Sequence, residues 1–118
     1  MVDELFYQSI ATLSDRLAKK EISAIELTKA VIERTRRVES KIQAFNSRDE
    51  DDALAQALAS DERRAAGDSK GPLDGIPIGL KDLIAVKNQP LTASSKMLAD
   101  FISPYDATVT EKLKQAGA

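Results

Sequence analysis

The residues best suited to chemistry in this sequence are Lys81 and Asp82, which directly follow an apolar run. That run, IPIGL at residues 76–80, predicts a short buried strand with Pro77 near its start. Sites often form where the strands of an α/β sheet end, and a lysine held out of water there can act as a base toward a serine hydroxyl. Asp82 is expected either to orient a neighbouring group or to cap a turn.

The absence of two residue types narrows the chemistry further. The chain contains no histidine and no cysteine. Within this segment, that absence excludes cysteine nucleophiles, serine–histidine triads, disulfides and zinc sites built from cysteine or histidine. A lysine base is therefore the one plausible route to serine-based acyl transfer here.

The glycines around the lysine do not match a phosphate-binding loop. Such a loop has four residues between its glycines and a serine or threonine after its lysine. Here Gly75 and Gly79 enclose three residues, and Lys81 is followed by Asp82. No nucleotide cofactor is therefore predicted for this segment.

Two other polar groups fit structural roles better than chemical ones. The acids at 49–52 lack the alternation and the glycine of a calcium loop, and they are typical of a solvated helix start. Ser94 and Ser95 fit a turn or a helix N-cap better than a pair of nucleophiles. No metal site is predicted.

Composition places the chain among soluble globular proteins. Of its 118 residues, 42% are hydrophobic, and the aromatic residues are three phenylalanines and two tyrosines. The core should therefore be aliphatic, and a net charge of −2 gives no basic surface for nucleic acid. The N-terminus lacks a basic leader, and no apolar run approaches the ~20 residues of a membrane span. These features predict a cytoplasmic protein without a membrane partner.

Two helices are expected before residue 43. Apolar residues three and four apart predict the first within residues 10–21, with Thr12 as its N-cap. Ser23 and Glu26 form a capping-box pattern, so the second helix should begin at Ala24. Its predicted apolar stripe comprises Ala24, Leu27, Val31, Val38 and Ile42.

Two more helices are expected after residue 47. The alanine-rich residues 48–66 predict one, with acids in its first turn, arginines in its last and Gly67 as its end. Residues 106–116 predict the other, capped by Asp106 or Thr108. Its predicted buried face comprises Val109, Leu113 and Ala116.

One short strand cannot form a sheet, so this order of elements reads as the front of a larger α/β domain. Within a single domain over 1–118, residues 1–67 are predicted to be helical, and residues 68–118 to begin the α/β core.

Three motifs then resemble the amidase signature family: GPLDGIPIGLKDLI from Gly71, SKMLADF from Ser95 and PYDATV from Pro104, together with Thr92. The resemblance is strongest to one branch, the A subunits of tRNA-dependent amidotransferases. It implies an α/β fold in which helices cover a mixed sheet. This chain would supply N-terminal helices and one short core strand of that fold.

The family uses a Ser–cis-Ser–Lys triad, and the resemblance makes Lys81 its lysine, a partly buried amine. It implies glutamine hydrolysis that supplies ammonia to a B subunit, which amidates charged tRNA using ATP and Mg²⁺, while a C subunit clamps the complex. Both serines and the glutamine-binding residues are expected beyond Ala118, so the segment alone should be inactive and bind no cofactor.

Two positions depart from the family's pattern. Leu83 stands where asparagine is common, and Asn88 stands where glycine is common; asparagine tolerates the left-handed backbone that a glycine there serves. Two rival functions stay open. One is an amidase-signature hydrolase of small amides, and the other is a helical interaction module without catalysis.

Overall fold

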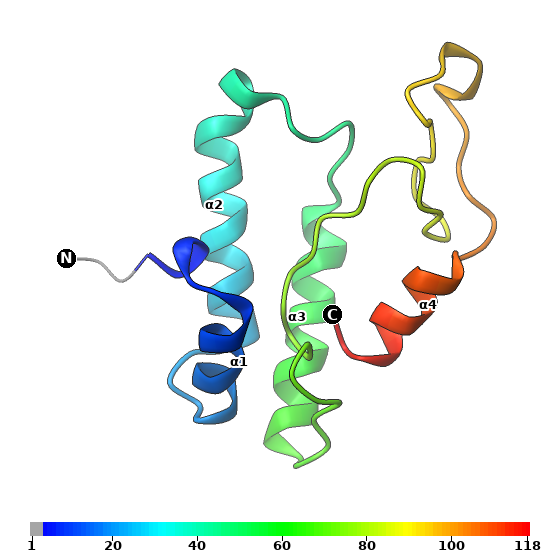
Figure 1. Cartoon of the computed structure of the whole chain (residues 1–118). Helices are drawn as coiled ribbons and strands as arrows, with labels where there is room; N and C mark the ends of the chain where they lie inside the picture. The colour runs from blue at the N-terminus through cyan, green and yellow to red at the C-terminus, as the bar shows by residue number, and fades with distance from the viewer. Residues whose placement is uncertain (1–3) are drawn as a thin grey trace. The chain divides into compact units, whose positions relative to one another are not determined.

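The computed structural model describes residues 4–118, and the chain forms two units. The first unit extends to Pro77 and includes Ala116–Ala118, whereas the second comprises Ile78–Gln115. The helices of the first unit are η1 (Leu5–Tyr7), α1 (Ile10–Ala18), α2 (Ala24–Ile42) and α3 (Glu50–Ala65) (Figure 1). Those of the second unit are η2 (Lys96–Leu98) and α4 (Thr108–Gln115).

The N-cap of α1 is Ser9, and the prediction of Thr12 was wrong. The Ser9 hydroxyl oxygen accepts a hydrogen bond from the Thr12 N–H at 3.1 Å, so Thr12 lies inside the first turn. Both residues carry a hydroxyl near the start of the same apolar pattern, and that pattern alone does not choose between them. Leu13 and Leu17 are buried, whereas Ile10 is 50% exposed.

The predicted capping box at the start of α2 is confirmed. The Ser23 hydroxyl accepts the Glu26 N–H at 3.0 Å, and the Glu26 carboxylate accepts the Ser23 N–H at 2.8 Å. The predicted apolar stripe is correct only in its first half, because Leu27 is fully buried while Ile42 is 61% exposed. The second half of α2 therefore extends past the core.

The predicted signals at both ends of α3 are confirmed. Glu50, Asp51 and Asp52 lie in the first turn, and Arg63 and Arg64 lie in the last. Asp49, which the sequence placed in the first turn, is the N-cap, and its carboxylate accepts the Asp52 N–H at 2.9 Å. Gly67 follows with a left-handed φ of 78°, and its N–H bonds to the carbonyl of Arg64 at 3.2 Å. This is the glycine-terminated helix end that the sequence predicts.

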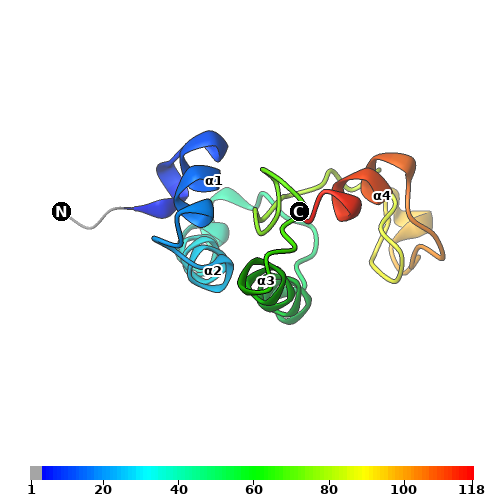
Figure 2. The same cartoon turned by 90° about the horizontal axis from the view of Figure 1, so that it is seen from below.

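Helices α2 and α3 run antiparallel and side by side, as both views show (Figures 1 and 2). A carboxylate of α3 joins them: Asp61 accepts the N–H groups of Ala24 and Ile25 at 2.7 and 3.1 Å. These two N–H groups have no partner within α2, because the first turn of a helix leaves its amides unpaired. The negative charge also lies at the positive end of the helix dipole.

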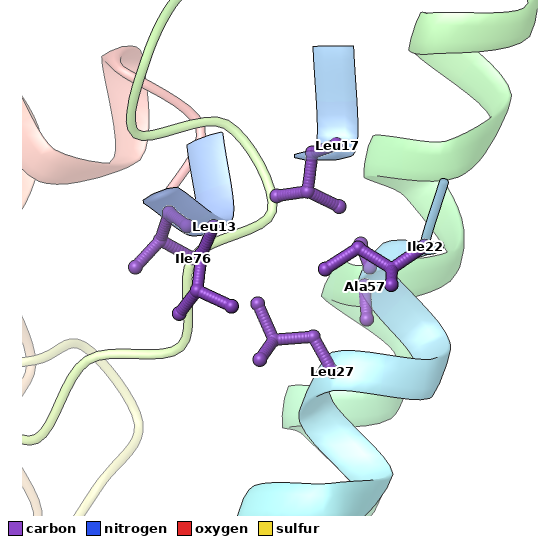
Figure 3. Close-up of a cluster of buried hydrophobic side chains, with 7 residues drawn as sticks. Leu13, Leu17, Ile22, Leu27, Ala57 and Ile76 are labelled. Atoms are coloured by element: carbon purple, nitrogen blue, oxygen red, sulfur yellow. The ribbon is translucent and has the colours of Figure 1, made fainter. Parts of the chain in front are cut away.

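An aliphatic core fills the space between these helices. Figure 3 shows its side chains converging from α1, α2, α3, the connection between α1 and α2, and the segment that follows α3. Its buried members are Leu13, Leu17, Ile22, Ala24, Leu27, Ala57 and Ile76. As composition predicts, aliphatic residues and alanine supply the whole of this cluster.

The segment after α3 is held by an ion pair whose acid is buried. Asp74 is 1% exposed, and its carboxylate accepts hydrogen bonds from Arg63 at 2.6 Å and from the Lys70 N–H at 2.8 Å. Burial alone raises the pKa of Asp74, but these hydrogen bonds outweigh it and lower the pKa to about 2. The next residue, Gly75, donates its N–H to the carbonyl of Gly117 at 2.9 Å.

The predicted strand over 76–80 is not formed, which corrects the expected contribution of one core strand. Ile76 is buried in the core of the first unit, whereas Ile78 is 40% exposed. Among residues 4–118, the β-type pairing is a single isolated antiparallel bridge between Pro90 and Ile102. A strand requires a neighbour for its backbone hydrogen bonds, so an apolar run does not suffice.

In α4 the buried residue is Thr110, not the predicted Val109. Thr110 is 2% exposed, whereas Val109 is 44% exposed. The Thr110 hydroxyl donates to the carbonyl of Ala85 at 2.8 Å, and the same carbonyl accepts the Ala107 N–H at 2.9 Å. A polar contact therefore anchors this helix within the second unit.

Candidate active site

Lys81 lies between the apolar run and a turn that begins at Asp82. The Lys81 carbonyl accepts the Ile84 N–H at 2.9 Å, which closes that turn. Its side chain is exposed, so the partial burial expected for the amine is not present in this structure. The physical reason is the missing strand, because within the run only Ile76 is buried.

Asp82 orients a segment ten residues later in the sequence. One carboxylate oxygen, Oδ1, accepts the Thr92 N–H at 2.8 Å, and the other, Oδ2, accepts the Thr92 hydroxyl. The main-chain oxygen of Asp82 accepts the Ala93 N–H at 2.8 Å. These three hydrogen bonds hold Thr92 and Ala93 against the residue that directly follows Lys81.

Ser94 and Ser95 lie at the turn that Asp82 holds. Ala93 and Ser94 adopt left-handed φ values of 47° and 57°. The Ser94 N–H lies 3.3 Å from the Thr92 hydroxyl oxygen, and Ser95 immediately precedes η2. The prediction that these serines belong to a turn or a helix start is confirmed, and their surroundings give no reason to make them nucleophiles.

Asp106 is the second acid that organises this unit. Its carboxylate accepts the Lys87 N–H at 2.7 Å and pairs with the Lys114 ammonium at 2.9 Å. The bond from the Lys87 N–H, followed by the bond from Lys114, lowers the pKa of this carboxyl. Neither predicted cap of α4 is therefore confirmed, since Asp106 binds elsewhere and Thr108 is the first helical residue.

Backbone pairing closes the loop between these two acids. The Asn88 N–H bonds to the Ser103 carbonyl at 2.8 Å, the Ser103 N–H to the Gln89 carbonyl at 3.0 Å, and the Leu91 N–H to the Phe101 carbonyl at 3.0 Å. Asn88 has a φ of 67°, which confirms that this position requires the left-handed backbone. Asparagine adopts it more readily than most residues other than glycine.

The partners of Asp82 and Asp106 could not be predicted from the sequence. Their hydrogen bonds reach 10 residues forward to Thr92 and 19 residues back to Lys87, beyond the range of turn and helix-cap rules. The sequence feature that points to these contacts is the residue type. Aspartates at the two ends of a long loop are suited to accepting hydrogen bonds from N–H groups of its backbone.

The acidic run at 49–52 serves the start of α3. Asp49 is its cap, and Glu50 forms ion pairs with Arg36 and Arg48. Within residues 4–118, no group of three or more histidine, cysteine or acidic side chains is arranged to hold a metal ion. In the same part of the chain, no helix combines the length and apolarity needed to cross a membrane.

Comparison with protein families gives one match, to the family described as Amidase, over residues 26–118. Known relatives include the A subunit of glutamyl-tRNA(Gln) amidotransferase from Moorella thermoacetica, 47% identical over 115 residues, and that from Thermobifida fusca, 48% identical over 114 residues. The two alignments cover 98% and 97% of this chain. The chain spans about a quarter of the length of these relatives, 24% and 23% respectively.

Two solved structures have a similar backbone. One is a peptide amidase in complex with the competitive inhibitor chymostatin, with a TM-score of 0.89 and 31% identity over 95% of this chain and 23% of that one. The other is a vestigial protein complex described in connection with the origins of an s-triazine catabolic enzyme. Its TM-score is 0.88 and its identity 28%, over 94% of this chain and 24% of that one.

Proposed function

This chain belongs to the amidase family, and from that premise we propose that it forms part of the glutaminase subunit of a tRNA-dependent amidotransferase. Its fold is the predicted α/β amidase-signature fold, of which residues 4–118 contribute helices. The observation that carries the proposal is the 47% identity to an amidotransferase A subunit over 115 residues, against 31% to the peptide amidase.

In this proposal Lys81 is the base of a Ser–cis-Ser–Lys triad. One serine attacks the side-chain amide carbon of glutamine, while its proton passes through the bridging serine to the amine of Lys81. Backbone N–H groups stabilise the oxyanion. The carbon–nitrogen bond then breaks, the proton goes to the departing ammonia, and water releases glutamate from the acyl-enzyme.

We assign neither Ser94 nor Ser95 to this triad, because both occupy the turn and helix start held by Asp82 and Thr92. The proposal therefore takes both catalytic serines from outside these 118 residues. It follows that residues 1–118 by themselves are expected not to hydrolyse glutamine.

The proposed partners follow from the same reaction. Free ammonia must reach an activated acyl group on tRNA, which we assign to a B subunit that uses ATP and Mg²⁺, with a C subunit joining the two. The cytoplasm is the proposed compartment, because it holds the charged tRNA. This segment itself is proposed to bind no cofactor and no membrane.

A hydrolase of small amides is the second candidate. The backbone likeness to a peptide amidase, with a TM-score of 0.89, favours it. The two candidates differ in what stimulates the reaction. An amidotransferase subunit releases more ammonia from glutamine when partner subunits, ATP and charged tRNA are present, whereas a small-amide hydrolase acts without them.

The test is a chimera of the Moorella thermoacetica A subunit, in which residues of this chain replace the aligned region, assembled with the partner subunits. Cooperative unfolding of the chimera shows that the exchange is tolerated. We expect glutamine hydrolysis by the chimera and a loss of about 1,000-fold or more in Lys81→Ala, because the triad loses its base.

The matched control is Lys112→Ala, which removes an exposed lysine of α4 and should leave hydrolysis within about twofold. Undiminished glutamine hydrolysis in Lys81→Ala would remove this lysine from the mechanism. A folded chimera that cleaves small amides but does not respond to charged tRNA would favour the second candidate.

A further inference from the structure

Three hydrogen bonds of Asp82 hold the backbone beside Lys81. Both carboxylate oxygens are engaged by Thr92, one by its N–H at 2.8 Å and one by its hydroxyl. The main-chain oxygen of Asp82 accepts the Ala93 N–H at 2.8 Å. A side chain bound at both oxygens and a backbone bound at its carbonyl cannot turn independently of the Thr92 segment.

Lys81 shares a peptide bond with this fixed residue. Its own carbonyl accepts the Ile84 N–H at 2.9 Å, so the peptide between Lys81 and Asp82 lies within a closed turn. The rest of the lysine is a flexible chain of four methylene groups that ends in a compact charge. Fixing its Cα is therefore the main means by which the fold can direct its amine.

The direction of these hydrogen bonds defines what Asp82 can do. The carboxylate accepts from both donors of Thr92, so its two oxygens serve as acceptors within the unit. The Thr92 hydroxyl donates a hydrogen bond to Asp82 and accepts one from the Ser94 N–H at 3.3 Å. Both groups are thus committed to holding the turn.

We propose that Asp82, acting through Thr92, is a positioning residue for Lys81. This inference rests on the proposed function, in which Lys81 is the triad base. Asp82 and Thr92 touch no reacting atom in it. They set the place from which the amine reaches the bridging serine, and a misplacement of about 1 Å can cost a catalyst about 100-fold in rate.

The test uses the chimeric complex with four single variants and one double variant. Asp82→Ala removes all side-chain contacts to Thr92, and kcat for glutamine hydrolysis should fall about 100-fold with KM unchanged. Thr92→Val keeps the N–H and loses the hydroxyl, and kcat should fall about 10-fold. Thr92→Ser keeps both groups and should stay within about twofold of the parent.

Asp82→Asn is the conservative variant, and it should retain most of the activity that Asp82→Ala loses. Its amide oxygen can accept the Thr92 N–H, and its amide nitrogen can donate to the Thr92 hydroxyl oxygen, so kcat should stay within about threefold of the parent. The double variant Asp82→Ala with Thr92→Val should lose no more than Asp82→Ala alone, because both remove the same contact.

Rates are counted per reactive serine, titrated with an electrophilic glutamine analogue. A merely structural role lowers the number of reactive sites and leaves kcat per site unchanged, and that result overturns the proposal. The proposal is also overturned if Asp82→Asn lowers kcat as much as Asp82→Ala does. A third contrary result is a kcat loss in the double variant that equals the product of the two single losses. If Lys81→Ala itself retains activity, the proposed function fails instead.

Discussion

The two units of this chain are stabilised by different forces. The first buries a cluster of aliphatic side chains from three helices and the segment after them. In the second, among the residues that the structure describes, Ala85 is the one buried hydrophobic side chain, while Ser103 and Thr110 are buried polar ones. The hydrophobic effect thus dominates in the first unit, and hydrogen bonds from side chains to the backbone dominate in the second.

Exposure of apolar side chains shows the same difference. Eight large hydrophobic residues of the second unit are exposed, with Met97 at 96%, against five among the described residues of the much longer first unit. Regions with few buried apolar contacts open at lower free energy than a packed core. The candidate catalytic lysine therefore lies in the unit whose geometry depends on specific polar contacts, so single polar substitutions there should affect geometry before global stability.

The largest expected loss of stability comes from a leucine truncation, and the same truncation in each unit tests the comparison. Leu27→Ala, which truncates a fully buried residue of α2, should lower the free energy of unfolding by about 3 kcal/mol because it leaves a cavity. Leu83→Ala makes the same change in the second unit at a 57% exposed side chain, and should cost less than about 0.5 kcal/mol. Urea denaturation followed by circular dichroism measures both, and equal losses would contradict the comparison.

The next largest loss of stability is expected from substituting a glycine of the first unit. A Cβ on Gly75 would lie 2.7 Å from the Ser60 hydroxyl oxygen and 2.9 Å from the Cβ of Ala24, at a φ of 86°. Gly75→Ala should therefore cost about 2 to 3 kcal/mol of stability. Gly71→Ala has a positive φ but open space around it, so about 1 kcal/mol is expected. Similar losses from both would show that packing at Gly75 is unimportant.

The buried pair of Asp74 and Arg63 should make the first unit sensitive to acid. Folding lowers the pKa of Asp74 from 3.8 to about 2, so its contribution is present above pH 4 and is lost as the pH falls from about 4 to 2. The contribution is about 2 kcal/mol. Asp74→Asn should flatten this part of the stability–pH curve.

The smallest effect concerns the second unit alone. Thr110→Val keeps the shape of the side chain but loses the hydrogen bond to the Ala85 carbonyl. The free energy for opening α4 should therefore fall by about 1 kcal/mol. Hydrogen exchange at the Ala107 amide should become about fivefold faster, while the slowest amides of α2 keep their rates. Thr108→Val alters an exposed threonine of the same helix and should leave exchange at Ala107 nearly unchanged.

The features that the sequence predicted correctly are local. The capping box of Ser23 and Glu26, the acidic first turn of α3 and the glycine end of that helix each involve residues within one or two turns of helix. Their geometry is fixed by helix hydrogen bonding itself, so spacing and residue type suffice. Errors of a few residues, as at Ser9 and Thr12, arise where two suitable side chains compete.

The features that the sequence did not predict depend on residues far away along the chain. The segment 76–80 has the composition of a strand, but a strand forms only beside another, and spacing along one chain does not supply that neighbour. The same holds for Asp82 with Thr92, whose pairing depends on how the intervening loop folds back. Lys81 was identified from its place after an apolar run and from family motifs, and its catalytic role stays a prediction.

The carboxylate that α3 places at the start of α2 also constrains the order of folding. Asp61 is 37 residues from Ala24 in sequence, so its hydrogen bond forms only after the loop between the two helices has closed. Until then the first turn of α2 has only its own capping box. Completion of that turn and docking of α3 are thus one cooperative event, and the first unit should lack an intermediate with a finished α2 and a detached α3.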